Sequence, residues 1–416
     1  MRLAYTLLLY LLAPFVLLRL LWRSRELRAY RERIGERFGF VEGAPEGVAV
    51  WVHAVSVGET IAALPLIEAL LERHGDRQVW VTTMTPTGSA RVIASLGARV
   101  RHSYVPYDLP DAVARFLDRA QPRQVVVMET EIWPNLFRAI ARRGIPLTVA
   151  NARLSPRSFA GYSRIRKAVA GVLGDCAMVA AQSGADADRF RALGAPRVSV
   201  MGNIKFDLAL PDDKISAGRG LRQNLGASRS VWIAASTHEG EEEQALAAHA
   251  RVLEKMPHAL LILVPRHPQR FDPAARLVEK AGLAMQRRSA FDPARQVHVL
   301  VGDSMGEMFM YFAASDVAFV GGSLVQVGGH NVLEPAAIGL PVLFGPHMFN
   351  FLAARELLLK ANAGLEIVDA TSLANVLLDL FAGSKRAQEM GRAGQRAVEA
   401  NRGALQRLLQ LLDAGQ

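Results

Sequence analysis

Short apolar runs rich in β-branched residues alternate with amphipathic stretches along almost the whole chain, in two successive series. The first series predicts strands at residues 48–52, 78–83, 103–106, 125–128, 147–151, 178–181 and 198–201. The second predicts strands at 231–235, 260–264, 297–301, 317–320, 342–344 and 365–368. Continuous apolar strands separated by helices are typical of parallel sheets covered on both faces. The sequence therefore predicts an α/β protein with two doubly wound domains.

The expected domain boundaries follow from where this alternation pauses. Residues 207–220 are polar and contain Pro211, three aspartates and two glycines, so they are predicted to be a linker. This places one domain at 23–206 and a second at 221–395, with a C-terminal helix in 396–416 that crosses back onto the first domain. Ligands of such sheets bind beyond the carboxyl ends of the strands, so two domains facing a cleft would bind substrates there.

The N-terminal segment is expected to be a membrane anchor, residues 1–22. Residues 3–18 are uncharged and rich in leucine, interrupted only by Pro14. Basic residues follow this run, and no Ala-x-Ala cleavage site lies behind it, which argues against a cleaved signal peptide. Positive charge on the C-terminal side of the apolar run favours a cytoplasmic position for the rest of the chain. The helix could span the bilayer or lie in one leaflet. The alternative is a buried amphipathic helix, but the run is apolar on all sides.

The charge of the chain predicts anionic partners. The formal net charge is +10 and the pI is about 10.1, without a clustered basic tail. No helix-turn-helix or RNA-binding signature is present, so acidic lipid and a phosphorylated small molecule are favoured over nucleic acid. The single cysteine, Cys176, excludes an intrachain disulfide and a cysteine-built zinc site.

The glycine-rich stretch at 321–335, with Gly-Pro-His at 345–347, predicts a nucleotide site in the second domain. Gly328 and Gly329 would let the backbone approach a ligand, and a short helix beginning near Asn331 would face a phosphate. Glu334, one turn further, could accept hydrogen bonds from ribose hydroxyls. The alternative is that the glycine pair only forms a turn.

Three other segments of the second domain follow predicted strands. Arg266 suits a phosphate or carboxylate, or else a surface salt bridge. The segment 302–307 offers backbone groups to a base or sugar, and its Gly-Asp-Ser triplet lacks the later Asp-x-x-His that would activate Ser304 as an esterase nucleophile. In 236–242, His238-Glu239 resembles the start of a zinc motif, but position 242 is Glu242. The segment 236–242 either begins a helix or shapes the predicted nucleotide site.

In the first domain, carboxylates cluster at predicted strand ends. Glu59 lies at the start of a helix, where it could be a general base for a sugar hydroxyl or simply stabilise the helix. Glu129 and Glu131 would point to the same side if their strand continued. Lys205 could offset charge on a departing phosphate.

Residues 151–155, Asn-Ala-Arg-Leu-Ser, also lie at a predicted strand end. Asp186-Ala-Asp188 has the spacing of a metal-binding Asp-x-Asp motif. On the expected helix at 183–193 these two side chains point apart, so this pair is predicted to be solvated surface.

With these residues identified, the sequence resembles the 3-deoxy-D-manno-octulosonic acid (Kdo) transferases of lipopolysaccharide synthesis, a family with the GT-B fold of two Rossmann-like domains. The resemblance runs essentially end to end. It includes His-x-Val-Ser-Val-Gly-Glu-Thr, Thr-Thr-Met-Thr-Pro-Thr-Gly-Ser, Pro-Tyr-Asp-Leu-Pro, Met-Glu-Thr-Glu-x-Trp-Pro-Asn, Asn-Ala-Arg-Leu-Ser, Ser-Thr-His-Glu-Gly-Glu-Glu, Val-Pro-Arg-His-Pro, Val-Gly-Gly-Ser-Leu-Val and Gly-Gly-His-Asn-x-x-Glu.

The resemblance implies an inverting glycosyltransferase at the cytoplasmic face of a bacterial inner membrane. It implies CMP-Kdo as the donor, the tetraacylated lipid A precursor as the acceptor, bound by the N-terminal domain, and no metal or other cofactor in the chemical step. Glu59 matches the general base that takes the proton of the acceptor's 6′-hydroxyl, and Glu129 and Lys205 match transition-state stabilisers. The positions that match the CMP-contacting stretches are Pro265, Arg266, Met305, Gly306, Glu307, Asn331, Val332, Leu333 and Glu334.

Two other functions are kept as alternatives. One is a GT-B transferase that acts on lipids with a uridine nucleotide as donor, and the other is a non-catalytic membrane adaptor that kept the nucleotide fold. Competition between CMP and uridine nucleotides would separate the first, and transfer activity would exclude the second.

Overall fold

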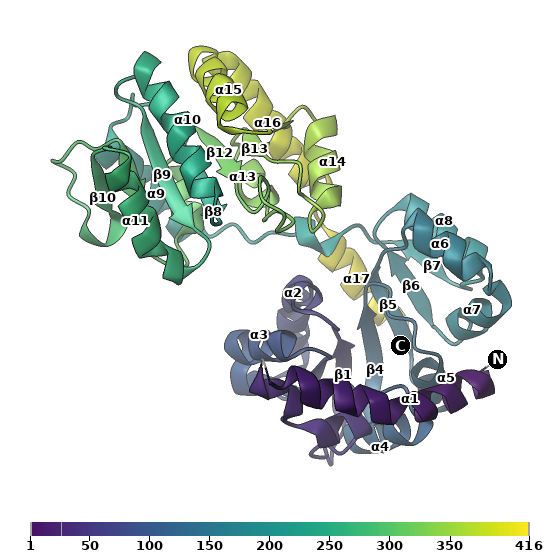
Figure 1. Cartoon of the computed structure of the whole chain (residues 1–416). Coiled ribbons are helices and arrows are strands. Elements are labelled where there is room, and N and C mark those ends of the chain that lie inside the picture. Colours follow the sequence, from purple (N-terminus) through teal and green to yellow (C-terminus); the bar gives the residue numbers. More distant parts are fainter. Residues whose placement is uncertain (1, 26, 415–416) are drawn as a thin grey trace. The chain divides into compact units, whose positions relative to one another are not determined.

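The computed structural model describes residues 2–25 and 27–414, which form two compact units (Figure 1). The first comprises residues 1–207 together with 402–416, and the second comprises 208–401. Each is built around its own seven-stranded, wholly parallel sheet. This confirms the α/β class with two doubly wound domains.

The first unit orders its strands β3-β2-β1-β4-β5-β6-β7. The strands are β1 (Val48–His53), β2 (Val79–Thr83), β3 (Arg101–Tyr104), β4 (Pro122–Met128), β5 (Leu147–Ala152), β6 (Met178–Ala181) and β7 (Val198–Val200). All residues of β1, β2 and β5 are buried, as expected for strands with helices on both faces. The helices are α1 (Arg2–Arg23), α2 (Val57–His74), α3 (Pro86–Leu96), α4 (Pro110–Ala120), α5 (Pro134–Arg142), α6 (Pro156–Ser163), α7 (Arg166–Leu173), α8 (Gly184–Leu193) and α17 (Ala404–Asp413).

The second unit orders its strands β10-β11-β9-β8-β12-β13-β14. They are β8 (Val231–Thr237), β9 (Leu260–Pro265), β10 (Met285–Arg287), β11 (Val299–Val301), β12 (Val317–Val320), β13 (Val342–Phe344) and β14 (Gly364–Glu366). Its helices are α9 (Asp212–Leu225), α10 (Glu241–Lys255), α11 (Phe271–Lys280), α12 (Met308–Ala313), α13 (Leu333–Ala337), α14 (Leu352–Lys360), α15 (Ala370–Ala382) and α16 (Ser384–Ala400). Short 3₁₀ turns complete both units: η1 (Arg28–Arg31), η2 (Ile34–Phe38), η3 (Gly97–Arg99), η4 (Ile204–Phe206), η5 (Pro268–Arg270) and η6 (Arg288–Ala290).

All thirteen predicted strands are present, and only the edge strand β10 was missed. Met285-Gln286-Arg287 is three residues long and has no β-branched residue, so its sequence carries no strand signal.

The predicted linker at 207–220 is wrong over most of its length. Helix α9 starts at Asp212 and packs against α12. Gly218 is buried in this contact, where a Cβ atom would lie 2.4 Å from the carbonyl oxygen of Met310. Glycine here permits two helices to approach closely and is not a sign of a flexible connection.

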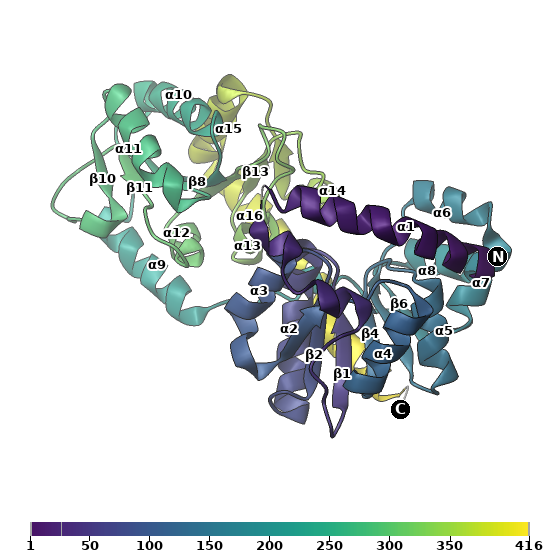
Figure 2. The same ribbon diagram turned by 60° about the horizontal axis from the view of Figure 1, so that its bottom comes forward.

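The chain's last helix belongs to the first unit, and the predicted range 396–416 combines two elements. Residues up to Ala400 belong to α16 of the second unit, whereas α17 lies against α2 and the first sheet (Figures 1 and 2). Asp207 accepts hydrogen bonds from the backbone N–H groups of Gly403 and Leu405 at the start of α17, each at 2.5 Å. Leu408, Leu409 and Leu412 are buried in the core of the first unit.

Helix α1 is 22 residues long, its most apolar stretch of 18 residues has a mean hydropathy of 2.0, and none of its described residues is buried. It lies along the outside of the first unit beside α4 and α5 (Figure 1). Its hydroxyl groups hold it there: Tyr5 donates to Asp108, Thr6 to Asn135 and Tyr10 to Asp111, at 3.0, 3.1 and 2.6 Å. The sequence expectation of an exposed apolar helix at the N-terminus is confirmed.

Candidate functional site

The first unit carries a group of carboxylates at the carboxyl ends of β1 and β4. Glu59 lies in the first turn of α2, and Glu129 and Glu131 follow β4. Since β1 and β4 are paired neighbours, their ends lie at the same edge of the sheet. The pKa of Glu59 is raised to about 7, chiefly by burial and also by the charges of Glu129 and Glu131, while hydrogen bonds from Val55 and Ser56 lower it. Both Glu129 and Glu131 therefore lie close enough to Glu59 for their charges to act on it.

Glu59 also stabilises the start of α2. Its carboxylate accepts hydrogen bonds from the backbone N–H of Val55 at 2.8 Å and from the hydroxyl of Ser56 at 3.0 Å. The Ser56 hydroxyl in turn accepts from the backbone N–H of Glu59. This is a helix-capping arrangement, so the structural role considered for Glu59 is present. A half-buried carboxyl with a pKa near 7 remains chemically suited to accept a proton as well.

Glu129 and Glu131 were expected to point to the same side if strand β4 continued through them. The strand does not continue. Strand β4 ends at Met128, and Glu129 has a φ of +57°. This left-handed conformation is uncommon for a residue with a side chain and tends to occur at functional positions. It brings the Glu129 carboxylate to 3.8 Å from the ammonium of Lys205. Glu131 instead accepts a hydrogen bond from the indole N–H of Trp133 at 2.8 Å.

Asn151 connects β5 to the segment that carries Lys205. It also has a positive φ, +53°, and its side-chain oxygen accepts the backbone N–H of Ile204 at 3.1 Å. Its side-chain nitrogen is buried without a hydrogen-bond partner among the described residues. Asn203 accepts the backbone N–H of Lys205 and starts η4. The sequence placed Asn151 at a strand end but did not reveal this role, because the contact crosses 53 residues.

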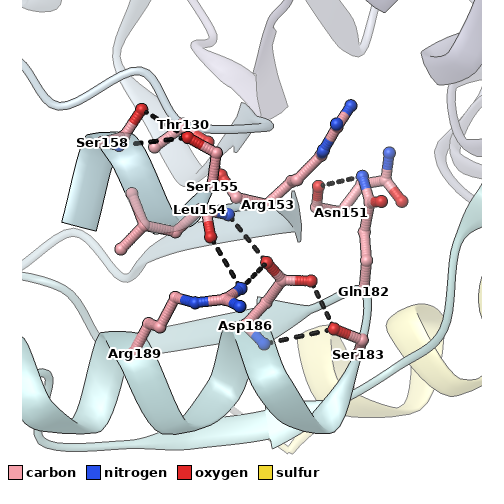
Figure 3. Close-up of polar contacts among 10 residues, drawn as sticks. All are labelled: Thr130, Asn151, Arg153, Leu154, Ser155, Ser158, Gln182, Ser183, Asp186 and Arg189. Carbon is pink, nitrogen blue, oxygen red and sulfur yellow. Dashed lines mark hydrogen bonds and ion pairs between the residues drawn. The ribbon is translucent and has the colours of Figure 1, made fainter. Parts of the chain in front are cut away.

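The loop after β5 is held by Asp186 (Figure 3). The Asp186 carboxylate accepts the backbone N–H of Leu154 at 2.9 Å, and Arg189 lies 3.3 Å from it while donating to the Leu154 carbonyl. Ser183 donates to the same carboxylate. The prediction that this Asp-x-Asp pair is solvated surface is therefore wrong for Asp186, which is 8 % exposed, and holds only for Asp188. Helical spacing correctly predicted that the side chains of Asp186 and Asp188 point in different directions. It did not indicate which of them faces the protein.

The loop fixed in this way presents Arg153 to solvent. Its backbone carbonyl accepts a hydrogen bond from Thr130, which neighbours Glu129. Its side chain points away from the other residues drawn in Figure 3. A cation is thus held at the same sheet edge as the acidic residues.

The second unit contains a pocket of about 260 Å³ at the carboxyl ends of β8, β9, β11 and β12. Seven of the nine predicted donor residues line it: Pro265, Arg266, Met305, Gly306, Glu307, Asn331 and Glu334. Val332 and Leu333 do not; they are buried at the start of α13, with exposures of 0 % and 1 %. Arg266 is exposed and forms no ion pair within the described part of the chain.

Hydrogen bonds orient the pocket's two carboxylates. Burial raises the pKa of Glu334, which accepts a hydrogen bond from the Asn331 amide at 3.1 Å. Glu307 accepts from the Ser304 hydroxyl and lies 3.5 Å from Arg288. Ser304 also contacts the Tyr311 hydroxyl at 2.6 Å. Ser304 is thus hydrogen-bonded to a carboxylate and a phenol, and among the described residues it forms no hydrogen bond with an imidazole.

Gly328 and Gly329 do not face the pocket. A Cβ atom at Gly328 would lie 2.3 Å from the Asn350 amide, and one at Gly329 would lie 2.2 Å from the Met348 sulfur. Both have positive φ, and their N–H groups bond the Gly322 carbonyl. The expectation that these glycines admit a ligand is wrong, since their space is taken by the protein's own 347–350 loop.

His330, which follows these glycines, lines the pocket and was not singled out from the sequence. Its Nε2 lies 2.8 Å from Nε2 of His238, and the two rings are stacked. Burial, with Arg266 next, lowers the pKa of His330 to about 4. His238 therefore pairs with another histidine, and the described residues contain no group of three or more metal-ligating side chains. Glu241, from the same motif, is fully buried and accepts the backbone N–H groups of Gly322, Ser323 and Leu324.

Comparison with known proteins identifies the family. Residues 32–208 match the model of the 3-deoxy-D-manno-octulosonic-acid transferase N-terminal region. The 3-deoxy-D-manno-octulosonic acid transferase of Haemophilus influenzae is 42% identical over 99% of this chain and 98% of its own length. The chain belongs to the 3-deoxy-D-manno-octulosonic acid transferase family.

A second relative supports the family, and a solved structure shows the fold. The transferase of Bordetella pertussis is 40% identical over 98% of both chains. MurG of Acinetobacter baumannii superposes with a TM-score of 0.55 at 15% identity, over 88% of this chain and 99% of that one, which shows a shared GT-B-like fold. The resemblance identified from the motifs is confirmed, as is the transferase class.

Proposed function

We propose that the chain transfers Kdo from CMP-Kdo to the 6′-hydroxyl of the tetraacylated lipid A precursor, with inversion and release of CMP. Family membership and the chemistry of the two sheet edges support this. The observation that carries it is the pair formed by a proton-accepting Glu59, with a pKa near 7, and the Glu129–Lys205 ion pair at the same edge of the first sheet.

In the proposed step, Glu59 takes the proton of the acceptor hydroxyl while the hydroxyl oxygen attacks the anomeric ketosidic carbon. The bond between that carbon and the CMP phosphate oxygen breaks, and the phosphate retains the electron pair. Glu129 and Lys205 stabilise the transition state, with the ammonium of Lys205 offsetting the developing negative charge. No proton needs to reach CMP, because a phosphate monoester leaves as an anion.

The pocket of the second unit is proposed to bind the CMP part of the donor. Arg266 offers an unpaired guanidinium to the phosphate. Glu334 is oriented by Asn331 to accept from ribose hydroxyls, and the segment Met305–Gly306–Glu307 offers backbone groups to the base. Calorimetric competition tests this: CMP should displace the donor, whereas UMP and UDP should not. Stronger binding of a uridine nucleotide would instead support a lipid transferase of different donor class.

Two substitutions at Glu59 separate catalysis from helix capping. Glutamine can retain a helix-capping contact but cannot accept the proton, so Glu59→Gln should fold and bind CMP normally yet lose transfer. Glu59→Ala should lose transfer and also some stability, about 1 kcal/mol. Transfer near the wild-type rate in Glu59→Gln would mean that Glu59 only caps α2.

We further propose that α1 anchors the chain at the cytoplasmic face of the bacterial inner membrane. The helix exposes a continuous apolar surface, with Leu3 75% and Leu11 69% exposed. Arginines lie at its C-terminal end and just beyond it, where they suit anionic headgroups on the cytoplasmic side.

A further inference from the structure

The first unit has a cavity that the proposed chemistry does not use. It is a groove of about 710 Å³ between the N-terminal end of α1 and helices α5 and α7. This volume is within the range of about 300–1,000 Å³ usual for ligand pockets. Apolar side chains dominate its walls, among them Leu3, Ile132, Ile165 and Val172.

The groove also carries an excess of positive charge. Arg2, Arg138 and Lys167 line it, and Asp175 pairs with Arg138 at 2.9 Å. Arg2 and Lys167 form no ion pair among the described residues, and both are exposed. An apolar wall with two unpaired cations is complementary to an amphiphile that combines hydrocarbon with phosphate.

The groove adjoins the carboxylate edge of the first sheet. Ile132 and Pro134, which line it, belong to the segment that follows Glu129 and Glu131. Tyr162 forms another part of the wall, and its pKa is raised by burial and then by the charge of Glu131. Glu131 in turn raises the pKa of Glu59. The groove is therefore adjacent to the group of carboxylates.

We propose that this groove binds an acyl chain of the lipid acceptor, with Arg2 and Lys167 meeting its phosphate. This rests on the proposed function, since it assigns the acceptor's position. An acceptor bound here would have its hydrocarbon beside the apolar α1 helix and its sugar hydroxyls toward Glu59. The acceptor is assigned as the occupant because it combines acyl chains and phosphate with the sugar hydroxyl from which Glu59 is proposed to take a proton.

Two glycines offer a matched test. Gly171 lines the groove on α7, and a Cβ atom there meets nothing within 4 Å, so Gly171→Leu should fill the groove without disturbing the fold. Gly161 on α6 has the same free space but does not line the groove, so Gly161→Leu is the control. Lys167→Glu, with Arg166→Glu as control, tests the charge independently.

The measurements use the full-length chain in detergent. For the tetraacylated acceptor, Gly171→Leu should raise KM about tenfold, roughly the effect of excluding two buried methylene groups, and leave kcat unchanged. For the same phosphorylated disaccharide without acyl chains, it should change nothing, and Gly161→Leu should match the wild type on both. Equal behaviour of the two variants, or equal losses on both acceptors, would overturn the proposal.

A binding readout distinguishes this proposal from the proposed function. The tetraacylated acceptor with a photoactivatable acyl chain, without donor, should label peptides of α5 and α7, less in Gly171→Leu and Lys167→Glu than in their controls. That labelling would persist even if no sugar were transferred, in which case only the proposed function fails. Equally strong labelling by a photoactivatable phosphatidylglycerol would show a bulk-lipid site and overturn the assignment to the acceptor.

Discussion

Glu59 shows how one carboxyl can serve both structure and chemistry. An ordinary glutamate would be ionised well below neutral pH, but burial and two neighbouring acidic residues keep this one protonated up to about pH 7. Its capping contacts use N–H and O–H donors, which favour the charged form and limit the rise of the pKa. The balance leaves a carboxyl that changes charge at neutral pH.

The pH dependence of transfer should report this balance. Because the base must be ionised, kcat/KM should fall as pH decreases through about 7, about tenfold per pH unit below it. Glu131→Gln removes one of the charges that raise the pKa of Glu59 and should move this limb to lower pH. A pH–rate series on both proteins checks the shift, and an unchanged limb in Glu131→Gln would argue against Glu59 as the titrating group.

Asp186 and Asp188 form a natural pair for measuring how much the loop after β5 depends on one buried carboxylate. Asp186→Ala leaves the N–H of Leu154 and the guanidinium of Arg189 without their partner, so it should lower the free energy of unfolding by about 2–3 kcal/mol. Asp188→Ala removes only an exposed ion pair with Arg191 and should change it by less than about 0.5 kcal/mol. Denaturant titration of both variants is the measurement; equal effects would contradict the role of Asp186.

At the residue scale, local motifs predicted residues that lie together in the structure, while the binding roles of these residues stay predictions. Arg266, Met305 and Glu334 each follow or begin an element whose pattern is clear, and all three line the predicted pocket. The roles of Asn151, Asp186 and His330 were not visible. Each depends on a partner that is distant in sequence, 53, 32 and 92 residues away, and no local spacing encodes such a contact.

At the scale of elements, the apolar runs located the strands well because parallel strands are buried on both faces and read as continuous hydrophobic segments. Two elements were not predicted from the sequence. The edge strand β10 has little apolar content, and α9 begins in a polar, glycine-containing stretch that resembles a loop. In both cases tertiary contacts with a neighbouring element decide the conformation, and local propensity does not.

Helix α1 allows a direct prediction at this scale. Because none of its residues is buried and three side-chain hydroxyls connect it to the first unit, deletion of residues 1–22 should leave a folded protein. The shortened chain should be recovered without detergent and should bind CMP as the full chain does. Circular dichroism, membrane flotation and CMP titration check this. An aggregated or unfolded product would mean that α1 is part of the globular core.

At the scale of the whole molecule, α17 makes the first unit discontinuous in sequence. The composition of the C-terminal stretch gave no reason to separate 396–400 from 404–413, since both parts are helical, yet they belong to different units. The division depends on Gly403, whose φ of +88° follows the end of α16 and precedes α17.

This arrangement predicts which unit a C-terminal substitution destabilises. Leu408→Ala creates a cavity in the core of the first unit and should cost that unit about 3 kcal/mol, lowering its melting transition while the transition of the second unit stays in place. The exposed Gln406→Ala on the same helix is the control. Calorimetry of the two variants, with CMP added to mark the second unit, is the check; a shift of the CMP-sensitive transition instead would contradict the assignment.

The return of α17 has a consequence for synthesis on the ribosome. The segment that completes the first core leaves the exit tunnel only after the entire second unit has emerged. Until then the nascent first unit lacks three of its buried leucines, although its apolar N-terminal helix is already available to the membrane. Targeting can therefore begin on a chain whose first domain is incomplete, and only translation products that extend through α17 can complete its core.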